Sequence, residues 1–257
     1  MAETNFDINE LILDQVLSLT TSDLETGKIN LRISSIEDGS LQTSADGEEI
    51  TNNIGSPITT LYRAKRGVLS GTSSLWSSDL YASQLGTQKK IATTENKIED
   101  YTYEVLTISD GTVELQHLPK NLKYIYAFNN GIGKAYTAGA EASANEFAIA
   151  EKVITVPTGL TGKVYVEYAY DADRAIEIVN KGSNFPTMVR LSAFVMYRDP
   201  CNDGKKYFGK ILAKKAKLNA EQVETALTTG GKHPFEFKML QSYCDDDDEL
   251  FKVIVAE

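Results

Sequence analysis

Apolar side chains along this chain recur mostly at every second position, which is the period of a β-strand. The run 28–36 is typical, because Ile29, Leu31 and Ile33 fall on one face. Thr, Val, Ile and Tyr, which favour a pleated and half-buried surface, are enriched in such runs. Further strands are expected at 102–108, 121–128, 153–156, 163–170, 176–179, 187–198, 207–216, 234–243 and 249–255. With turn residues between the runs, the pattern predicts a mainly β protein.

One segment has helical rather than strand spacing. Within 73–85 the apolar residues recur at roughly the helical period. Ser73 or Ser74 can cap the start of a helix, and Gly86 suits a left-handed stop. The pattern therefore predicts a single helix packed on a sheet. The stretch 11–19 fits either a strand or a short helix, and a strand or extended arm is favoured.

The middle of the chain looks separable from its two ends. Residues 101–171 hold about five strand-like runs, interrupted by a small-residue stretch at 135–144 that is typical of a loop. We expect a small inserted β-sandwich, immunoglobulin-like or similar, at 101–171. Residues 1–98 and 176–257 would then form one discontinuous β domain that carries the helix.

Composition and charge narrow the function classes. The chain has 257 residues, 42% of them hydrophobic, and a formal net charge of −10. It can bury a sizeable core, but its acidic excess argues against a nucleic-acid binder. Its apolar runs are shorter than the roughly 20 residues that a membrane span needs. The first residues lack the basic flank of a signal peptide, so neither a signal peptide nor a membrane partner is expected.

The sequence carries no sharp catalytic or metal-binding motif. Cys201 and Cys244 are interpreted as ordinary thiols, and His117 and His233 as loop histidines without the spaced partners of a zinc site. Nucleophile-elbow, zinc-protease and phosphate-loop motifs are absent from the sequence. We therefore expect no enzyme activity, no catalytic residue, no metal and no cofactor.

A run of acidic residues near the C-terminus is the most conspicuous charged feature. Contiguous carboxylates point in different directions and lack the alternation of a calcium loop. The run is interpreted as a solvated loop, or as an acidic surface that faces another subunit or a polyanion. Its members are Asp245, Asp246, Asp247, Asp248 and Glu249.

A second acidic stretch lies in the span 37–59, which is long for a hairpin connection of 2–5 residues. Such a connection is either a mobile surface excursion or a contact with a partner. Its acids, followed by a short basic group, are candidate inter-subunit contacts: Glu37, Asp38, Asp46, Glu48 and Glu49, then Arg63, Lys65 and Arg66.

Lysines are concentrated in the thirteen residues 205–217, which contain no acid. In a strand, Lys210 and Lys214 share one face. The lysines are interpreted as a charged outer face or a protected edge. Alternatively, Lys210, Lys214, Lys215 and Lys217 pair with the acidic loop of a neighbouring subunit.

The C-terminal third resembles a known family. A strand at 189–197 leads through the loop 199–204 to a second strand at 208–217. A polar connection, a third strand at 234–240, the acidic run and a last strand at 250–255 complete the order. This order is similar to the C-terminal half of bacteriophage major tail proteins, the tail tube proteins. The N-terminal part is compatible with the same family, so the resemblance covers about 1–98 and 176–257.

The resemblance implies a tail-tube-like β-sandwich or half-barrel and a non-enzymatic virion protein, made in the cytoplasm of the bacterial host. Six copies would form a ring, and rings would stack into the tail tube. Its partners would be further copies and other tail proteins such as terminator, tape measure and baseplate components. DNA would pass through the lumen without specific binding.

Two alternatives stay open. Another virion β-protein, such as a capsid decoration or baseplate component, would assemble differently. A carbohydrate-binding module or hydrolase would show grouped surface aromatic residues around a groove.

Overall fold

The structure is a computed structural model that describes residues 10–202, 204–221, 223–225, 227–242 and 248–256. It confirms a mainly β fold with one short helix. The chain divides into two compact units. Residues 90–177 form one unit, and residues 1–89 together with 178–257 form the other, which contains most of the range that resembles tail tube proteins and is named the tube unit after that resemblance. The immunoglobulin-like assignment of 101–171 stays a prediction.

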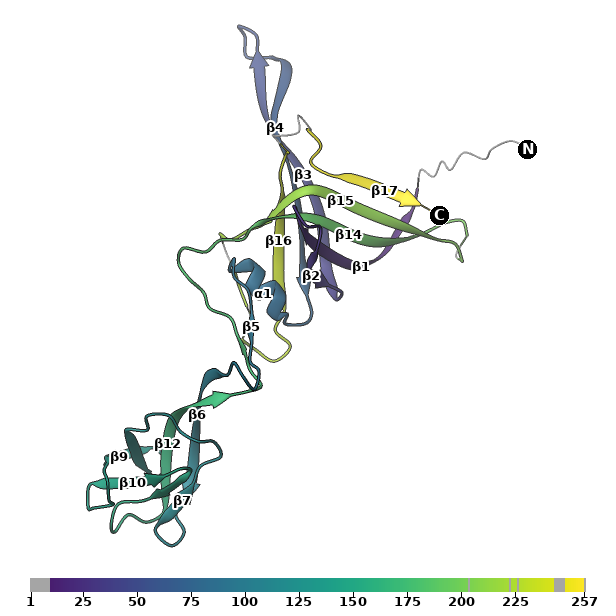
Figure 1. Cartoon of the computed structure of the whole chain (residues 1–257). Coiled ribbons are helices and arrows are strands. Elements are labelled where there is room, and N and C mark those ends of the chain that lie inside the picture. The colour runs from purple at the N-terminus through teal and green to yellow at the C-terminus, as the bar shows by residue number, and fades with distance from the viewer. Residues whose placement is uncertain (1–9, 203, 222, 226, 243–247, 257) are drawn as a thin grey trace. The chain divides into compact units, whose positions relative to one another are not determined.

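The tube unit is built on an eight-stranded sheet in the order β2-β1-β14-β15-β16-β4-β3, with β17 also paired to β15 (Figure 1). The strand predicted in 11–19 is confirmed as part of β1. The strands are β1 (Ile12–Asp23), β2 (Ile29–Ile33), β3 (Ile36–Thr51), β4 (Pro57–Ser73), β14 (Met188–Arg198), β15 (Lys206–Leu218), β16 (His233–Met239) and β17 (Lys252–Ala256).

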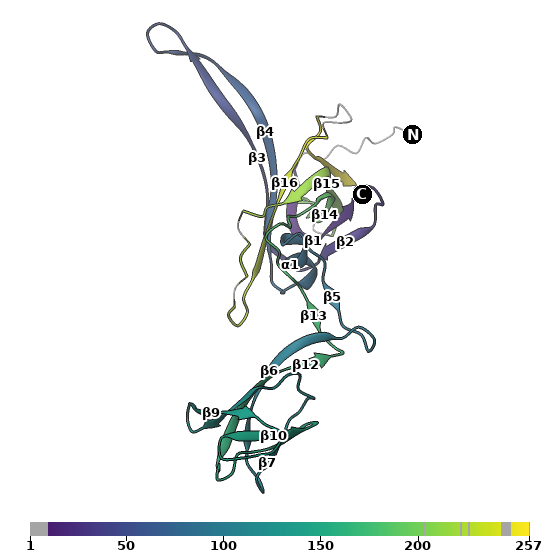
Figure 2. The same ribbon diagram turned by 60° about the vertical axis from the view of Figure 1, so that its left-hand side comes forward.

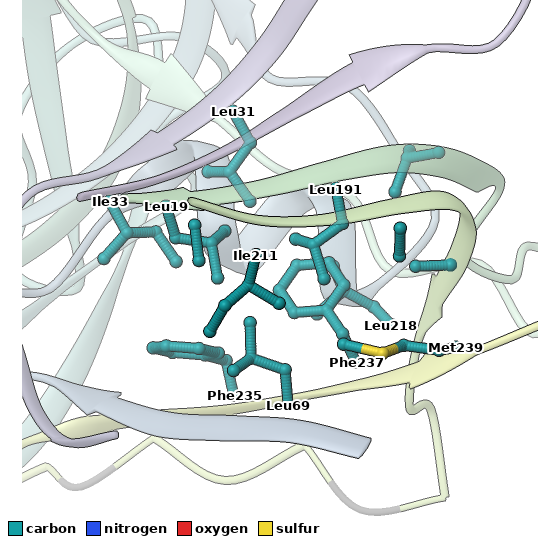
Figure 3. Close-up of a cluster of buried hydrophobic side chains, with 14 of the residues drawn as sticks. Leu19, Leu31, Ile33, Leu69, Leu191, Ile211, Leu218, Phe235, Phe237 and Met239 are labelled. Carbon is teal, nitrogen blue, oxygen red and sulfur yellow. The ribbon is translucent and has the colours of Figure 1, made fainter. Parts of the chain in front are cut away.

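The sheet of the tube unit folds over a single apolar core. β15 pairs with β17 over Phe208–Leu212 but with β16 only at Ala216–Leu218, so β16 and β4 diverge from β15. Leu191 on one side of the gap and Phe235 and Phe237 on the other fill the space between the diverging strands (Figure 3). The result is the predicted sandwich-like half-barrel.

The helix begins later than the sequence indicated. α1 (Ser78–Gln84) is capped by Ser77, whose hydroxyl accepts a hydrogen bond from the Leu80 amide at 3.3 Å. The prediction of Ser73 or Ser74 as the cap was wrong, because pairing with β16 extends β4 as far as Ser73. The predicted stop is confirmed, since Gly86 has a φ of 65°. An added Cβ there would lie 2.2 Å from the Phe185 carbonyl carbon, so glycine is required.

A buried histidine joins the helix to the sheet. His233 is the first residue of β16 and is 1% exposed, so its assignment to a loop was wrong. Gln84 donates through Nε2 to the Pro234 carbonyl at 2.8 Å, and its Oε1 lies 2.7 Å from His233 Nε2. The histidine therefore donates from Nε2. Its Nδ1 has no hydrogen-bond partner among the described residues.

We expect this histidine to make the tube unit less stable in mild acid. Burial lowers the pKa of His233 below its ordinary value near 6.5. The unfolded chain binds the proton first, so stability is complete above pH 6.5 and falls below it, by at most about 1.4 kcal/mol per pH unit. Denaturation between pH 5 and 8 measures the slope. His233→Gln should flatten the slope and His117→Gln should keep it; an unchanged slope in His233→Gln would contradict the assignment.

The second unit, residues 90–177, has its own sheet and core. Its seven-stranded sheet, in the order β6-β12-β8-β9-β10-β11-β7, curls until β6 and β7 approach each other. Ile125, Phe147 and Val164 are fully buried inside it. The strands of this sheet are β6 (Ile98–Thr107), β7 (Thr112–Glu114), β8 (Tyr124–Phe128), β9 (Ile132–Ala138), β10 (Glu146–Ala150), β11 (Val153–Thr155) and β12 (Lys163–Ala172). A separate two-stranded sheet pairs β5 (Lys90–Ile91) with β13 (Ile176–Glu177).

Within the described residues, no helix is long and apolar enough to cross a membrane.

Candidate self-assembly surface

The long acidic span after residue 36 is a hairpin and not an irregular connection. β3 and β4 pair antiparallel from Ile36–Ser73 to Thr51–Pro57, and the turn consists only of 52–56. Asn52 Oδ1 accepts hydrogen bonds from the Ile54 and Ser56 amides at 3.1 and 2.9 Å, which fixes the turn. The end of this hairpin extends well beyond the rest of the tube unit (Figure 2). The expectation of a 37–59 connection was therefore wrong.

The sequence pattern did not predict these strands, because neither face of the outer hairpin is buried. Every residue of β3 after Ile36 is exposed, so no apolar alternation marks it. The Asp-Gly pair at 38–39 lies inside β3 at a shift in register, and Asp38 has a φ of 52°. A second shift lies opposite Ala64, whose φ is 50°. Both are β-bulges, in which a residue with positive φ interrupts the pairing of a strand that then continues.

The charged residues predicted on this segment meet within the hairpin. Arg66 Nη2 lies 2.9 Å from Asp46 Oδ2, and Arg63 Nη2 lies 3.5 Å from Glu48 Oε2. All four side chains are more than 60% exposed, so each pair adds little to stability.

The remaining charged candidates of the hairpin lie along its length. Glu37 lies at the base, where it pairs with Lys232 at 2.5 Å. Asp38, Glu49 and Lys65 are exposed.

Apolar side chains near the hairpin tip are the feature that sequence reasoning missed. Ile54, Ile58 and Tyr62 are 85%, 65% and 74% exposed. Tyr62 pairs with Gly47 across the ribbon, where an added Cβ would lie 3.4 Å from the tyrosine ring. A two-stranded ribbon has no core of its own in which to bury these residues. These three residues therefore leave apolar side chains exposed near the tip of the hairpin.

The lysine-rich strand is β15. Lys210 and Lys214 are exposed, as a shared face predicts, whereas Lys215 and Lys217 are partly buried after a shift in register. Lys214 Nζ lies 4.0 Å from Glu249 Oε1, so the lysines and the acidic run meet within one chain. Asp248 is exposed. Asp245, Asp246 and Asp247 lie outside the described residues.

In the part of the chain that the structure describes, no group of three or more His, Cys, Asp or Glu side chains is placed to hold a metal ion. His117 stacks on Tyr170 with ring centroids 4.0 Å apart, which is a packing contact.

Comparison with known families agrees with this arrangement. The model of the YomU/Tube protein family matches residues 11–252, a range that also spans 101–171, which lay outside the resemblance drawn from the sequence. No curated protein matches the chain. The matched range contains the hairpin and every strand from β1 to β16. The chain therefore belongs to the YomU/Tube protein family, that is, to the phage tail tube proteins, and is a structural rather than an enzymatic component of the phage tail.

Proposed function

We propose that six copies of this chain form a ring and that rings stack into the tube through which phage DNA passes. The observation that carries the proposal is the β3–β4 hairpin. It extends beyond the rest of its unit and exposes Ile54, Ile58 and Tyr62, which no core of the described residues covers. In a stacked assembly these residues would be buried against the next copy. Head-to-tail contacts of this type close into rings or continue as filaments.

The edges of the sheet support ring formation. β2 and β3 end the sheet of the tube unit, so each leaves one side of its backbone without a strand neighbour in the described chain. Unpaired edges are templates for pairing with another copy. In the proposed ring, neighbouring sheets join into a continuous barrel.

The charges of the chain support both the proposed contact between copies and the proposed passage of DNA. On β15, Lys210 and Lys214 are exposed, and the hairpin carries exposed acids such as Glu49. We propose that these groups pair between copies, in addition to the pairs within each chain. The net charge of −10 favours a lumen that repels DNA phosphates, so that DNA slides without binding. Terminator, tape measure and baseplate proteins are the proposed further partners.

Electron microscopy over a concentration series tests the assembly. We expect sixfold rings and tubes, with light scattering giving the mass. The double variant Lys214→Glu/Lys215→Glu should raise the concentration needed for tubes about tenfold, because like charges then face each other. Lys97→Glu/Lys134→Glu, in the other unit, is the control with the same change in charge.

Two outcomes would count against the proposal. Rings without sixfold symmetry would contradict the hexamer. Tubes of unchanged yield from the Lys214/Lys215 variant, when its melting temperature equals that of wild type, would contradict charge pairing.

A further inference from the structure

The outer face of the second unit carries an aromatic strip. Strand pairing brings Tyr165 of β12 beside Val105 of β6 on one side and Tyr126 of β8 on the other. Because side chains alternate along a strand, the residues two positions away lie on the same face. The strip consists of Tyr101, Tyr103, Tyr124, Tyr126, Phe128 and Tyr165.

The rings of the strip contact one another around Tyr165. Its centroid lies 5.7 Å from that of Tyr103 in a stacked pair. The rings of Tyr126 and Phe128 lie 6.3 and 6.5 Å from it. Tyr101 and Tyr103 nevertheless remain 67% and 66% exposed, and Tyr124 remains 49% exposed. The strip is therefore an aromatic platform that faces solvent and whose rings are held in place by contacts with one another.

A groove of about 400 Å³ runs beside this platform. Glu167 and Ala169 of β12 line it between Tyr101 on β6 and the tyrosines Tyr124 and Tyr126 on β8. Its end is fixed by Lys120, whose amide donates to the Ala169 carbonyl at 2.7 Å.

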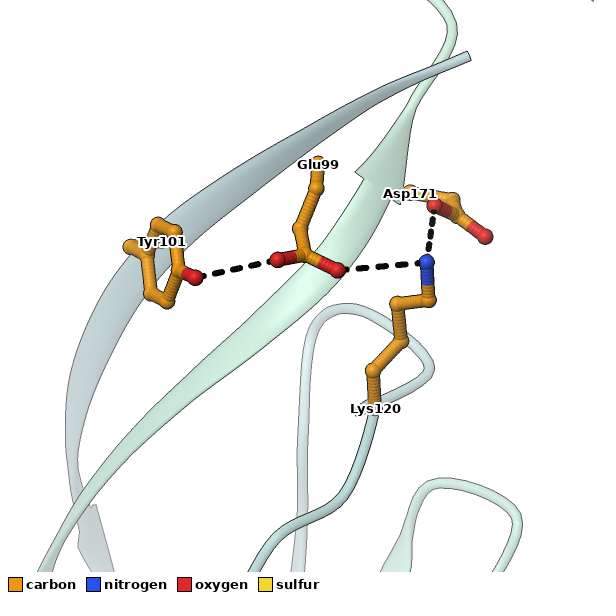
Figure 4. A network of polar contacts seen from close by, with 4 residues as sticks. All are labelled: Glu99, Tyr101, Lys120 and Asp171. Carbon is orange, nitrogen blue, oxygen red and sulfur yellow. Dashed lines mark hydrogen bonds and ion pairs between the residues drawn. The ribbon is translucent and has the colours of Figure 1, made fainter.

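Charged groups in the groove are held by one another. Lys120 Nζ lies 2.7 Å from Asp171 Oδ1 and 3.3 Å from Glu99 Oε2, and the Tyr101 hydroxyl donates to Glu99 Oε1 at 3.0 Å (Figure 4). The bond to Glu99 raises the pKa of Tyr101, and the bond to Asp171 raises the pKa of Lys120. The hydroxyl therefore stays protonated and the ammonium stays charged at neutral pH. The groove therefore presents oriented donors and acceptors of both charges, and Lys123 and Glu167 also line it.

Aromatic faces beside oriented hydrogen-bonding groups fit one class of ligand. A sugar ring presents apolar C–H groups to an aromatic face and hydroxyl groups to carboxylates, amides and ammonium groups at its edge. Glu99 and Asp171 together outnumber Lys120, and Glu167 offsets Lys123. The groove therefore has no basic excess to select a polyanion, and it matches a neutral ligand. Tyrosine is also enriched at protein interfaces, so a protein partner is the competing occupant that the tube-formation test below separates from a sugar.

We propose that the groove between Tyr101 and Tyr124 binds a neutral oligosaccharide. Sugar rings stack on the tyrosines, while Glu167, Lys120 and Asn121 contact the hydroxyl groups. The proposal is independent of ring formation, because every residue that it uses belongs to residues 90–177.

Calorimetric titration of the full chain tests the proposal with three probes: cellotetraose, maltotetraose and tetra-N-acetylchitotetraose. We expect at least one to bind, with Tyr101→Ala and Tyr124→Ala each weakening affinity about tenfold through the loss of one stacking face. Tyr101→Phe should retain most of the affinity, because the ring remains. Tyr62→Ala, which removes a 74% exposed tyrosine of the tube unit, is the control and should bind as wild type does.

Three outcomes would overturn the proposal. The first is that none of the three probes binds at millimolar concentration. The second is that binding is equally strong in Tyr101→Ala and Tyr124→Ala. The third is that these two variants fail to form tubes under conditions in which the wild-type chain forms them, because the face would then be a contact between copies.

Discussion

Replacing residues 45–65 by Asn-Gly is expected to give a folded chain that forms no tubes. Ser44 and Arg66 are register partners, so a two-residue turn can close the shortened hairpin between them. The retained part of β4, from Gly67 to Ser73, still pairs with β16 and still places Leu69 in the core. The variant therefore removes the exposed end of the hairpin without opening the tube unit.

The magnitude of this effect follows from the apolar tip. Burying an exposed Ile or Tyr side chain contributes roughly 1.5–3 kcal/mol. The double variant Ile58→Asp/Tyr62→Asp should therefore raise the concentration needed for tubes at least about 100-fold. Electron microscopy and light scattering measure both variants.

A matched control separates the apolar tip from the hairpin as a whole. Thr59→Asp changes a neighbouring exposed residue and should have a much smaller effect. Tubes of normal length from the shortened hairpin would contradict the assignment of this surface.

Truncating Phe237 is expected to lower the stability of the tube unit by about 3–5 kcal/mol. The side chain is fully buried, pairs in register with Leu69 and Leu218, and lies 6.1 Å from the Phe235 ring. Phe237→Ala leaves a cavity between two diverging strand pairs that cannot collapse onto it. Calorimetry should show the melting of this unit lowered by roughly 10 °C.

The same change in the other core shows whether the units melt separately. Phe147 is also fully buried, but in the core of residues 90–177. Phe147→Ala should lower a different transition and leave that of the tube unit in place. A single transition, shifted equally by both variants, would contradict two independent cores.

The buried strands could be predicted from sequence because their signal is local. In β14 and β15 alternate residues face the core, so apolar residues recur at every second position of the sequence. The start of the helix could not be predicted in the same way. Ser73 is a good cap in sequence, but its pairing with His233 keeps it in β4.

The candidate surfaces depend on which strands pair and in which register. Exposed strands need no alternation, so β3 has the composition of a loop although it pairs with β4 over its whole length. Likewise, the tyrosines of 101–103, 124–126 and 165 are far apart in sequence and meet only through the pairing of β12 with β6 and β8.

The sequence by itself determined the mainly β class, the single helix and the acidic charge, because composition and short-range periodicity specify them. Only the tertiary structure decided that the acidic span is an extended hairpin, that its charges pair with one another, and that the tyrosines form one face. The physical reason is that burial leaves a repeating pattern along the chain, whereas contacts between exposed side chains depend on strand register, which the pattern of an exposed strand does not record.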